Sequence, residues 1–293
     1  MKSKINKINN KDLVYKHKLR PGEVKDLWIA RIIIWFFILI TLFPIFSIIM
    51  ASLTKGDTFF STTLIPKELT FSNYIKVLND TDFKVWMKNS IILCSSAAFI
   101  QLFLSITGAY AFSRMKFKGR KNGLMSLLIL QMFPTVMALP AILGVCYKLN
   151  LIDEFWSLII LLAGGSAYSI WLLKGFVDSL PKELDEAAMV DGGSHWIVFT
   201  RIILPLSKPM LAVIFLFSFI GVYSEFLLTS ALMKDPANQT LATGLRQFIN
   251  NAFSAHWTQF SAAAVMAAVP VAIIFMLLQK FIANGLTAGA VKG

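Results

Sequence analysis

The most informative segment of this chain reads DEAAMVDGGSHWIVFTRIILP, residues 185–205. Its acidic and glycine residues interrupt a sequence that is otherwise strongly apolar. Of the 293 residues, 56% are hydrophobic and only 15% are charged, whereas an ordinary soluble domain carries about 25% charged residues. The composition therefore predicts a membrane protein that contains one short water-facing segment.

The net charge of +12 comes from Lys and Arg residues that lie between the apolar runs. A protein that binds nucleic acid gathers such charge on one face, whereas a membrane protein places it beside its spans. We therefore expect contact with membrane lipid and no nucleic-acid partner.

Six runs are apolar and long enough to cross a bilayer as helices: residues 32–53, 89–113, 122–147, 155–173, 209–233 and 258–279. The first covers about 33 Å at 1.5 Å per residue, against a hydrocarbon core of about 30 Å. No run alternates polar with apolar residues, which disfavours a β-barrel. The expected fold class is an all-α membrane protein with six transmembrane helices and one short cytoplasmic helix.

The basic residues also predict the orientation, because Lys and Arg accumulate in cytoplasmic loops. Most of the 28 Lys and Arg residues fall in segments on the same side as the N-terminus. Both termini and the segment 185–205 are therefore expected in the cytoplasm. The first apolar run is longer than the core of a signal peptide, which spans about 7–15 residues, so we expect a retained anchor.

The segment around residues 181–205 is expected to form two short helices. Pro181 suits the first turn, the acidic residues that follow complement the positive end of the helix dipole, and Gly192 can end the helix. Ser194 is a suitable N-cap for the second helix. Ala187 and Ala188 leave one side thin, so another protein could approach closely. An amphipathic linker resting on the membrane is the alternative.

The spacing Glu186-Ala187-Ala188, three residues, Gly192, nine residues, Ile202, one residue, Leu204-Pro205 resembles the EAA loop of permease subunits of bacterial ABC importers. Asp191 before the glycine also fits that loop. Three further stretches are similar to the MalG-type permease of maltose/maltodextrin importers: LIPKELTFSNY (64–74), QMFPTVMALPA (131–141) and NGLTAGAVKG (284–293). The similarity covers about residues 30–293.

The resemblance implies a multi-pass subunit of a bacterial cytoplasmic (inner) membrane that catalyses no reaction itself. The implied partners are a MalF-like sister permease, two copies of an ABC ATPase, an extracellular solute-binding protein and the transported sugar. ATP and Mg²⁺ would bind the ATPase, and this chain would bind no cofactor. The implied function is import of maltose or malto-oligosaccharides by alternating access, or of another sugar.

The resemblance also implies which residues contact these partners. Coupling to the ATPase would use Glu186, Ala187, Ala188, Asp191 and Gly192. A C-terminal tail would insert between the ATPase subunits through Asn284, Gly285, Leu286, Thr287, Ala288 and Gly289, with a disordered terminus as the alternative. Asn250 and Asn251 would contact the binding protein. The implied division is a basic cytoplasmic tail (1–26), the first helix with its external loop (27–85), the permease core (86–283, EAA loop at about 181–205) and the C-terminal tail (284–293).

Glu225 is a carboxylate within the fifth expected span. Such a group costs about 2.5–3.5 kcal/mol at the centre of a bilayer on insertion scales, and it usually faces a cavity or a partner. Two interpretations stay open: Glu225 lines the translocation pathway, or it packs through hydrogen bonds to Tyr223, Ser224 or a facing helix.

Two other classes of membrane protein fit the sequence less well. A secondary transporter usually carries several ionisable residues in its spans, and here one glutamate stands alone. A membrane enzyme would need a catalytic pattern, but the three histidines lie in expected loops or tails and form no HExxH motif. Cys94 and Cys146 have no second thiol or histidine at ligand spacing, so neither a disulfide nor a metal site is expected.

Overall fold

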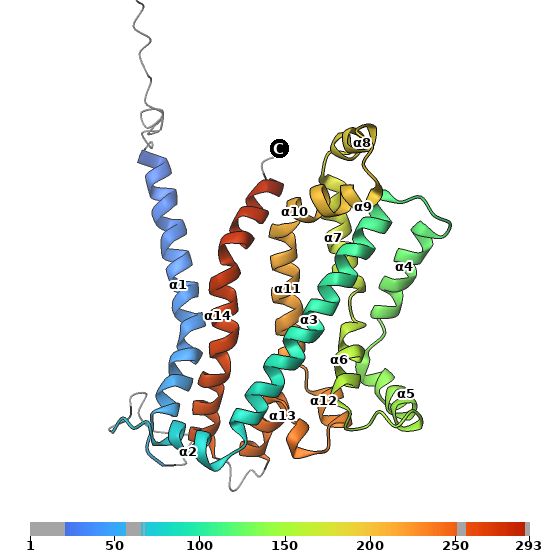
Figure 1. Cartoon of the computed structure of the whole chain (residues 1–293). Coiled ribbons are helices and arrows are strands. Elements are labelled where there is room, and N and C mark those ends of the chain that lie inside the picture. Colours follow the sequence, from blue (N-terminus) through green and yellow to red (C-terminus); the bar gives the residue numbers. More distant parts are fainter. Residues whose placement is uncertain (1–20, 57–65, 67, 251–255, 291–293) are drawn as a thin grey trace, which may run out of the picture. The chain divides into compact units, whose positions relative to one another are not determined.

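The computed structural model describes residues 21–56, 66, 68–250 and 256–290 (Figure 1). Within these ranges the chain is helical, and its one extended pairing is an isolated bridge between Thr54 and Leu69. The all-α fold class is therefore confirmed for the described residues. The α-helices are α1 (Pro21–Ser52), α2 (Ser72–Asp80), α3 (Phe83–Arg114), α4 (Arg120–Gln131), α5 (Thr135–Lys148), α6 (Phe155–Ala163), α7 (Ala167–Ser179), α8 (Glu183–Val190), α9 (His195–Val198), α10 (Leu204–Leu206), α11 (Lys208–Tyr223), α12 (Leu227–Leu232), α13 (Leu241–Leu245) and α14 (Trp257–Ala290). A π-helical turn, Phe199–Ile203, joins α9 to α10, and 3₁₀ turns occupy Pro236–Asn238 and Arg246–Ile249.

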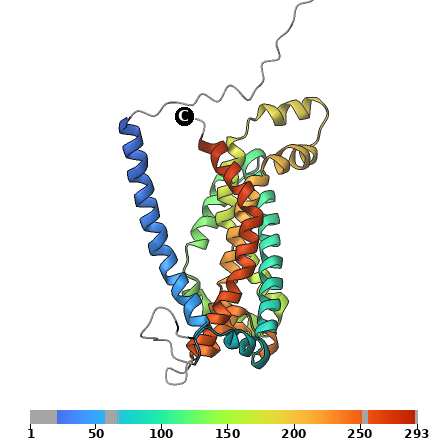
Figure 2. The same cartoon turned by 90° about the vertical axis from the view of Figure 1, so that its left-hand side faces the viewer.

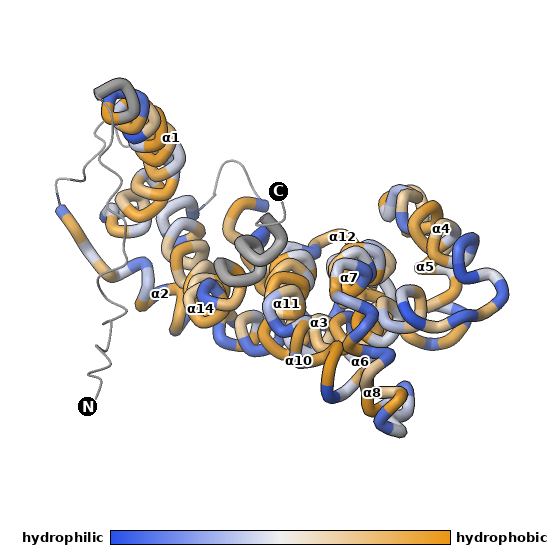
Figure 3. Tube along the Cα trace, turned by 90° about the horizontal axis from the view of Figure 1, so that it is seen from above, coloured by the Kyte–Doolittle hydropathy of each residue, from blue (hydrophilic) through white to orange (hydrophobic). Residues whose placement is uncertain are grey.

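The chain divides into two units, residues 1–48 and 49–293. The first contains most of α1, a single apolar helix that carries Pro44 in its interior. The second is a helical bundle in which α3 packs along both α7 and α11, and α11 packs along α14 (Figure 2). Viewed along the helices, orange hydrophobic segments are prominent in α11 and α14 (Figure 3), as expected for helices that face lipid as well as protein.

Two apolar clusters hold α3 in the middle of the 49–293 unit. Leu93 of α3 belongs to a cluster with Phe219 of α11 and Leu158 of α6. Nearer the end of α3, Tyr110 packs in a second cluster with Leu173 of α7. α3 therefore packs against helices at both ends of the 49–293 unit.

Three helices, α1, α3 and α14, are each long and apolar enough to cross a membrane, and three bent pairs raise the number to six if each pair is one span. The prediction of single helices over 122–147, 155–173 and 209–233 was wrong. α4 and α5 meet at 94°, and α6 and α7 meet at 43°. The run 209–233 divides into α11 and α12, and α11 itself meets the preceding short helices at 74°.

Local chemistry explains these bends. Pro134 follows α4 and cannot donate a helical hydrogen bond, and it also restricts the residue before it. Gly164 and Gly165 follow α6, where the absence of side chains lets the chain turn. Proline residues at 205 and 209 flank the bend between α10 and α11.

The backbone groups released at one bend are satisfied by glutamine side chains from neighbouring helices. Gln131 donates from Nε2 to the Gly165 carbonyl at 2.9 Å and accepts the Tyr168 N–H at 2.7 Å. Gln101 of α3 donates to the Leu162 carbonyl at 2.7 Å. A bend in an apolar span is stable when such partners replace the missing helical bonds.

Cys94 and Cys146 are buried free thiols. Their positions confirm the prediction that they are packing residues.

Candidate functional site

α8 is the short helix that the sequence predicts near residues 181–192. It begins at Glu183, so Pro181 precedes the helix instead of occupying its first turn. Gly192 adopts φ +83°, the left-handed conformation that favours glycine, and so ends the helix. Gly193 then donates its N–H to the Ala188 carbonyl at 2.8 Å, and a Cβ at Gly193 would stand 2.6 Å from that oxygen. Both glycines are required by the turn.

The two faces of α8 have different surroundings. Asp185 is buried and Ala188 is half-buried against α3 and α7. Glu186, Ala187, Asp191 and Gly192 lie on the exposed side. Val190, the last residue of α8, is 87% exposed. Its apolar side chain is therefore not covered by the described part of the chain. The candidate coupling residues are thus brought together, and most of them face outward.

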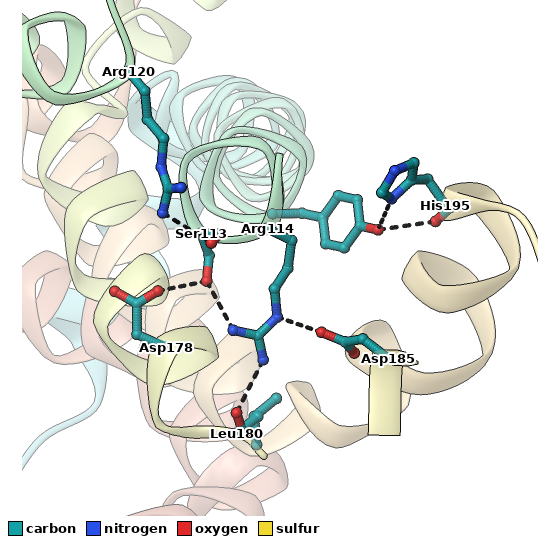
Figure 4. A network of polar contacts seen from close by, with 8 residues as sticks. Ser113, Arg114, Arg120, Asp178, Leu180, Asp185 and His195 are labelled. Atoms are coloured by element: carbon teal, nitrogen blue, oxygen red, sulfur yellow. Dashed lines mark hydrogen bonds and ion pairs between the residues drawn. The ribbon is translucent and has the colours of Figure 1, made fainter. Parts of the chain in front are cut away.

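Asp185 is held by an ion pair that the sequence did not predict. Arg114, the last residue of α3, places Nε 2.5 Å from Asp185 Oδ2 (Figure 4). The side chains are only 6% and 9% exposed. The same guanidinium donates from Nη2 to the Leu180 carbonyl at 3.0 Å, so it also fixes the turn that leads into α8.

A second set of contacts surrounds this pair and holds the ends of α3 and α7 together. Ser113 donates from Oγ to Asp178 Oδ1 at 2.5 Å, and Lys174 forms an ion pair with the same carboxylate. Arg120 donates to the carbonyls of Phe112 and Ser113 at 2.6 and 2.9 Å, which satisfies the C-terminal end of α3. The end of α3 is therefore fixed by two arginines.

The segment after α8 is tied to α3 as well. Tyr110 of α3 donates its hydroxyl to the His195 carbonyl at 3.1 Å, and the hydroxyl lies 3.2 Å from His195 Nδ1. Ser194 precedes α9 but makes no side-chain capping bond. Trp196 is 70% exposed. α8 and α9 are thus both anchored to α3 through polar contacts while their outer surfaces stay open.

A cavity of about 780 Å³ lies between α8 and the end of α3. Its lining includes Lys116, Lys182 and Glu186 in addition to the Arg114–Asp185 pair. α8 lies at one end of the 49–293 unit, beside the end of α3 (Figures 1 and 2).

Glu225 does not lie within a helical span. α11 ends at Tyr223, and Glu225 occupies the interruption before α12. Its carboxylate accepts the Leu228 N–H at 2.7 Å, the Thr229 N–H at 2.9 Å and the Thr229 hydroxyl at 2.7 Å. These partners differ from those that the packing interpretation named, but they give the carboxylate a capping role at the start of α12.

Asn250 directly follows the 3₁₀ turn Arg246–Ile249, which continues from α13. α13 and α8 lie at opposite ends of the 49–293 unit (Figure 1). It lines two adjoining cavities of about 460 and 330 Å³. Both also include Phe226 and Arg246, whose guanidinium carbon stands 5.1 Å from the centre of the Phe226 ring. Asn251 lies outside the described residues.

The predicted C-terminal contact residues, Asn284 to Gly289, belong to α14, whose backbone is helical to Ala290. They do not form a separate segment after the last helix. In Figure 1 this end of α14 and α8 lie at the same end of the 49–293 unit.

Sequence reasoning singled out the outward residues of α8 but missed Arg114. The available signal was weak, because a basic residue at the end of an apolar span is expected of any membrane helix. Asp185 was interpreted as a complement to the helix dipole, whereas the fold gives it a buried partner from a distant part of the chain.

The chain is similar over most of its length to known transport proteins. GanQ of Bacillus subtilis (strain 168), a galactooligosaccharides transport system permease protein, is 38% identical over 271 residues, which cover 91% of this chain and 96% of GanQ. The maltose/maltodextrin transport system permease protein MalG of Escherichia coli (strain K12) is 36% identical over 286 residues, which cover 91% of this chain and 96% of MalG. Among solved structures, a bacterial ABC transporter for import of the acidic polysaccharide alginate matches with a TM-score of 0.73 and 24% identity, covering 89% of this chain and 98% of that one.

The family model described as "Binding-protein-dependent transport system inner membrane component" matches residues 23–288. That range includes α8, the ion pair beneath it and all the bent spans. The chain is therefore a multi-pass membrane protein that belongs to the family of binding-protein-dependent transport system inner membrane components.

Proposed function

We propose that this chain is the permease subunit of an ATP-binding-cassette importer that moves malto-oligosaccharides across the cytoplasmic membrane. The observation that carries the proposal is α8: a short helix with an exposed outer face, fixed to the end of α3 by the buried Arg114–Asp185 pair. A helix of eight residues cannot span a membrane. Its geometry suits a contact that receives motion from a partner protein.

The contacts of α8 supply a route for that motion. An ATPase dimer that closes around ATP and Mg²⁺ displaces α8 through Glu186, Ala187, Ala188, Asp191 and Gly192. The ion pair passes the displacement to α3, and α3 packs along α7 and α11. The spans then move as packed bodies between inward- and outward-open states. ATP drives the change because it binds with different free energies to the two states.

The proposed orientation places α8 and both termini in the cytoplasm. The end of α14 lies at the same end of the 49–293 unit as α8, which supports a contact between Asn284–Gly289 and the two ATPase subunits. On the external side, Asn250 beside the Phe226–Arg246 pair is proposed to meet the solute-binding protein. A MalF-like sister permease completes the pathway, and the ATPase subunits alone hydrolyse ATP.

Glu225 is proposed to shape the pathway through α12 instead of binding sugar. Its two carboxylate oxygens already accept three hydrogen bonds from α12. This arrangement supports the packing interpretation over direct contact with a substrate.

The substrate is proposed from relatives of similar identity. MalG of Escherichia coli is named for maltose/maltodextrin transport, and MdxG of Bacillus subtilis, 38% identical over 225 residues, is named for maltodextrin transport. GanQ, named for galactooligosaccharides, matches equally well. A galacto-oligosaccharide importer is therefore the second candidate.

Reconstitution tests both candidates. The full chain would be placed in nanodiscs with its sister permease and ATPase, and ATP hydrolysis would be measured with the binding protein and a panel of sugars. Stimulation by maltose and maltodextrins is expected. Stimulation only by galacto-oligosaccharides would transfer the assignment to the second candidate, and hydrolysis insensitive to every sugar and to the binding protein would contradict both.

A further inference from the structure

A groove between α4 and α7 combines an apolar wall with a cluster of cations at one end. It has a volume of about 510 Å³, with Arg120, Lys121 and Lys174 at that end and Leu124, Leu128 and Trp171 along its length. We propose that this groove binds an anionic phospholipid, with the headgroup phosphate at the cations and an acyl chain along the apolar wall. The inference depends on the membrane location of the family and not on the transported sugar.

The arrangement of the two helices puts the cations together. On α4, Lys121, Leu124 and Leu128 follow a spacing of three and four residues and so share one face. On α7, Trp171 and Lys174 are three residues apart. The cations of α4 lie in its first turn, and Lys174 lies in the C-terminal half of α7. The groove brings these charged parts of the two helices together. The apolar part extends about 10 Å from Lys121 to Leu128 at 1.5 Å per residue, a depth that reaches the acyl chains.

The positive charge at this end is only partly neutralised within the described part of the chain. Asp178 pairs with Lys174, and no described carboxylate pairs with Lys121 or Arg120. Arg120 instead donates to two carbonyls of α3, which fixes its guanidinium at the groove. A cluster with two unneutralised cations beside a transmembrane groove has the chemistry that binds phosphate headgroups of anionic lipids.

The groove is open, so a molecule that fills it must match both its cationic end and its apolar wall. None of the residues of α4 is buried, and Met125 and Trp171 are 59% and 48% exposed. Because the chain bends by 94° after α4, this helix reaches only part of the way through a bilayer. A phospholipid is the membrane component that offers an anionic headgroup to the cations and a hydrocarbon chain to the apolar wall.

Native mass spectrometry of the full chain with its sister permease tests the proposal. The complex would be extracted from nanodiscs containing equal parts of phosphatidylglycerol and phosphatidylcholine, and the retained lipids would be counted. We expect preferential retention of phosphatidylglycerol, reduced about fivefold by Lys121→Gln. Leu128→Ser is expected to reduce retention of both lipids. Lys118→Gln is the matched control, since Lys118 lies in the preceding loop and does not line the groove.

Three outcomes would overturn the proposal. The first is equal retention of the two lipids. The second is displacement of phosphatidylglycerol by inorganic phosphate together with no effect of Leu128→Ser, which would indicate a site for phosphate alone. The third is a Met125→Cys thiol that is protected from maleimide only when the sister permease is present and whatever the lipid, which would make the groove a subunit interface. Thermal unfolding in phosphatidylcholine nanodiscs checks that each variant is folded.

Discussion

Arg114 and Asp185 form a buried ion pair between the last residue of α3 and the first turn of α8, with 2.5 Å between Nε and Oδ2. Water reaches neither side chain freely, so each charge depends on the other for compensation. Removing one partner of a buried pair costs about 3–5 kcal/mol, whereas replacing both with apolar groups is often tolerated. The pair is therefore a sensitive point in the connection between α8 and the bundle.

Asp185→Asn is expected to loosen α8 and to abolish ATP-driven sugar uptake, because Arg114 stays buried without its counter-charge. The reconstituted complex would show both a lower unfolding temperature and loss of coupling between ATP hydrolysis and transport. Glu183→Gln is the control, since it neutralises an exposed carboxylate in the same turn. The double variant Arg114→Met with Asp185→Leu should recover thermal stability. An Asp185→Asn protein as stable as the wild type would contradict the proposed role of the pair.

Glu186→Lys is expected to leave the chain folded and inserted, because Glu186 is exposed on α8. It reverses the charge on the proposed ATPase contact, so co-purification of the ATPase should fall sharply and uptake should be lost. Glu183→Lys makes the same change at the neighbouring acidic position and serves as the comparison. Normal ATPase capture by the Glu186→Lys protein would show that the contact lies elsewhere.

Gly192→Asp tests the turn that ends α8. A Cβ at this position meets nothing within 4 Å, so its cost comes from the backbone at φ +83°. That cost is about 1 kcal/mol, because Asp adopts the left-handed region more readily than most residues that carry a Cβ. We expect reduced ATPase capture with unchanged membrane insertion. Gly175→Ala, which also meets nothing within 4 Å and lies within α7, should have little effect. Transport at wild-type rates by the Gly192→Asp protein would remove this turn from the coupling site.

Glu225→Gln is expected to lower stability while sugar selectivity stays unchanged. The amide keeps one acceptor oxygen but turns a donor toward the backbone N–H groups of α12, and hydrogen bonds to a charged group contribute about 1.5–3 kcal/mol each. Thermal unfolding and competition between sugars in an uptake assay measure the two effects. Glu154→Gln is a suitable control, because that carboxylate accepts a bond from the exposed Trp156 indole. A shift in selectivity without loss of stability would instead favour a pathway-lining role.

Gly244→Ala is expected to destabilise the end of the 49–293 unit that contains α13. A Cβ at Gly244 would stand 2.1 Å from Cδ2 of Trp86, which is 1% exposed and has no room to move. Overpacking of this kind costs about 1–3 kcal/mol. Thermal unfolding of the purified chain should show the loss, and Gly221→Ala, which meets nothing within 4 Å, should not. Equal stability of the two variants would contradict the packing described for α13.

The sequence alone determined the features that depend on neighbouring residues. Composition and run length predicted an apolar all-α chain, and the spacing of Glu186, the following alanines and Gly192 predicted α8 and the residue that ends it. Helix initiation, capping and termination act within a few residues, so they can be read along the chain. The family resemblance rested on the same local spacing.

The tertiary structure decided what depends on distant partners. The run expected as a single helix over 155–173 is stable as a broken one because Gln101 and Gln131, which come from other helices, bond the backbone on either side of the break. Glu225 caps α12 only because α11 ends before it, and Asp185 is buried only because α3 brings Arg114 to it. A charged side chain in an apolar chain shows that a partner is needed, but packing alone determines which residue supplies it.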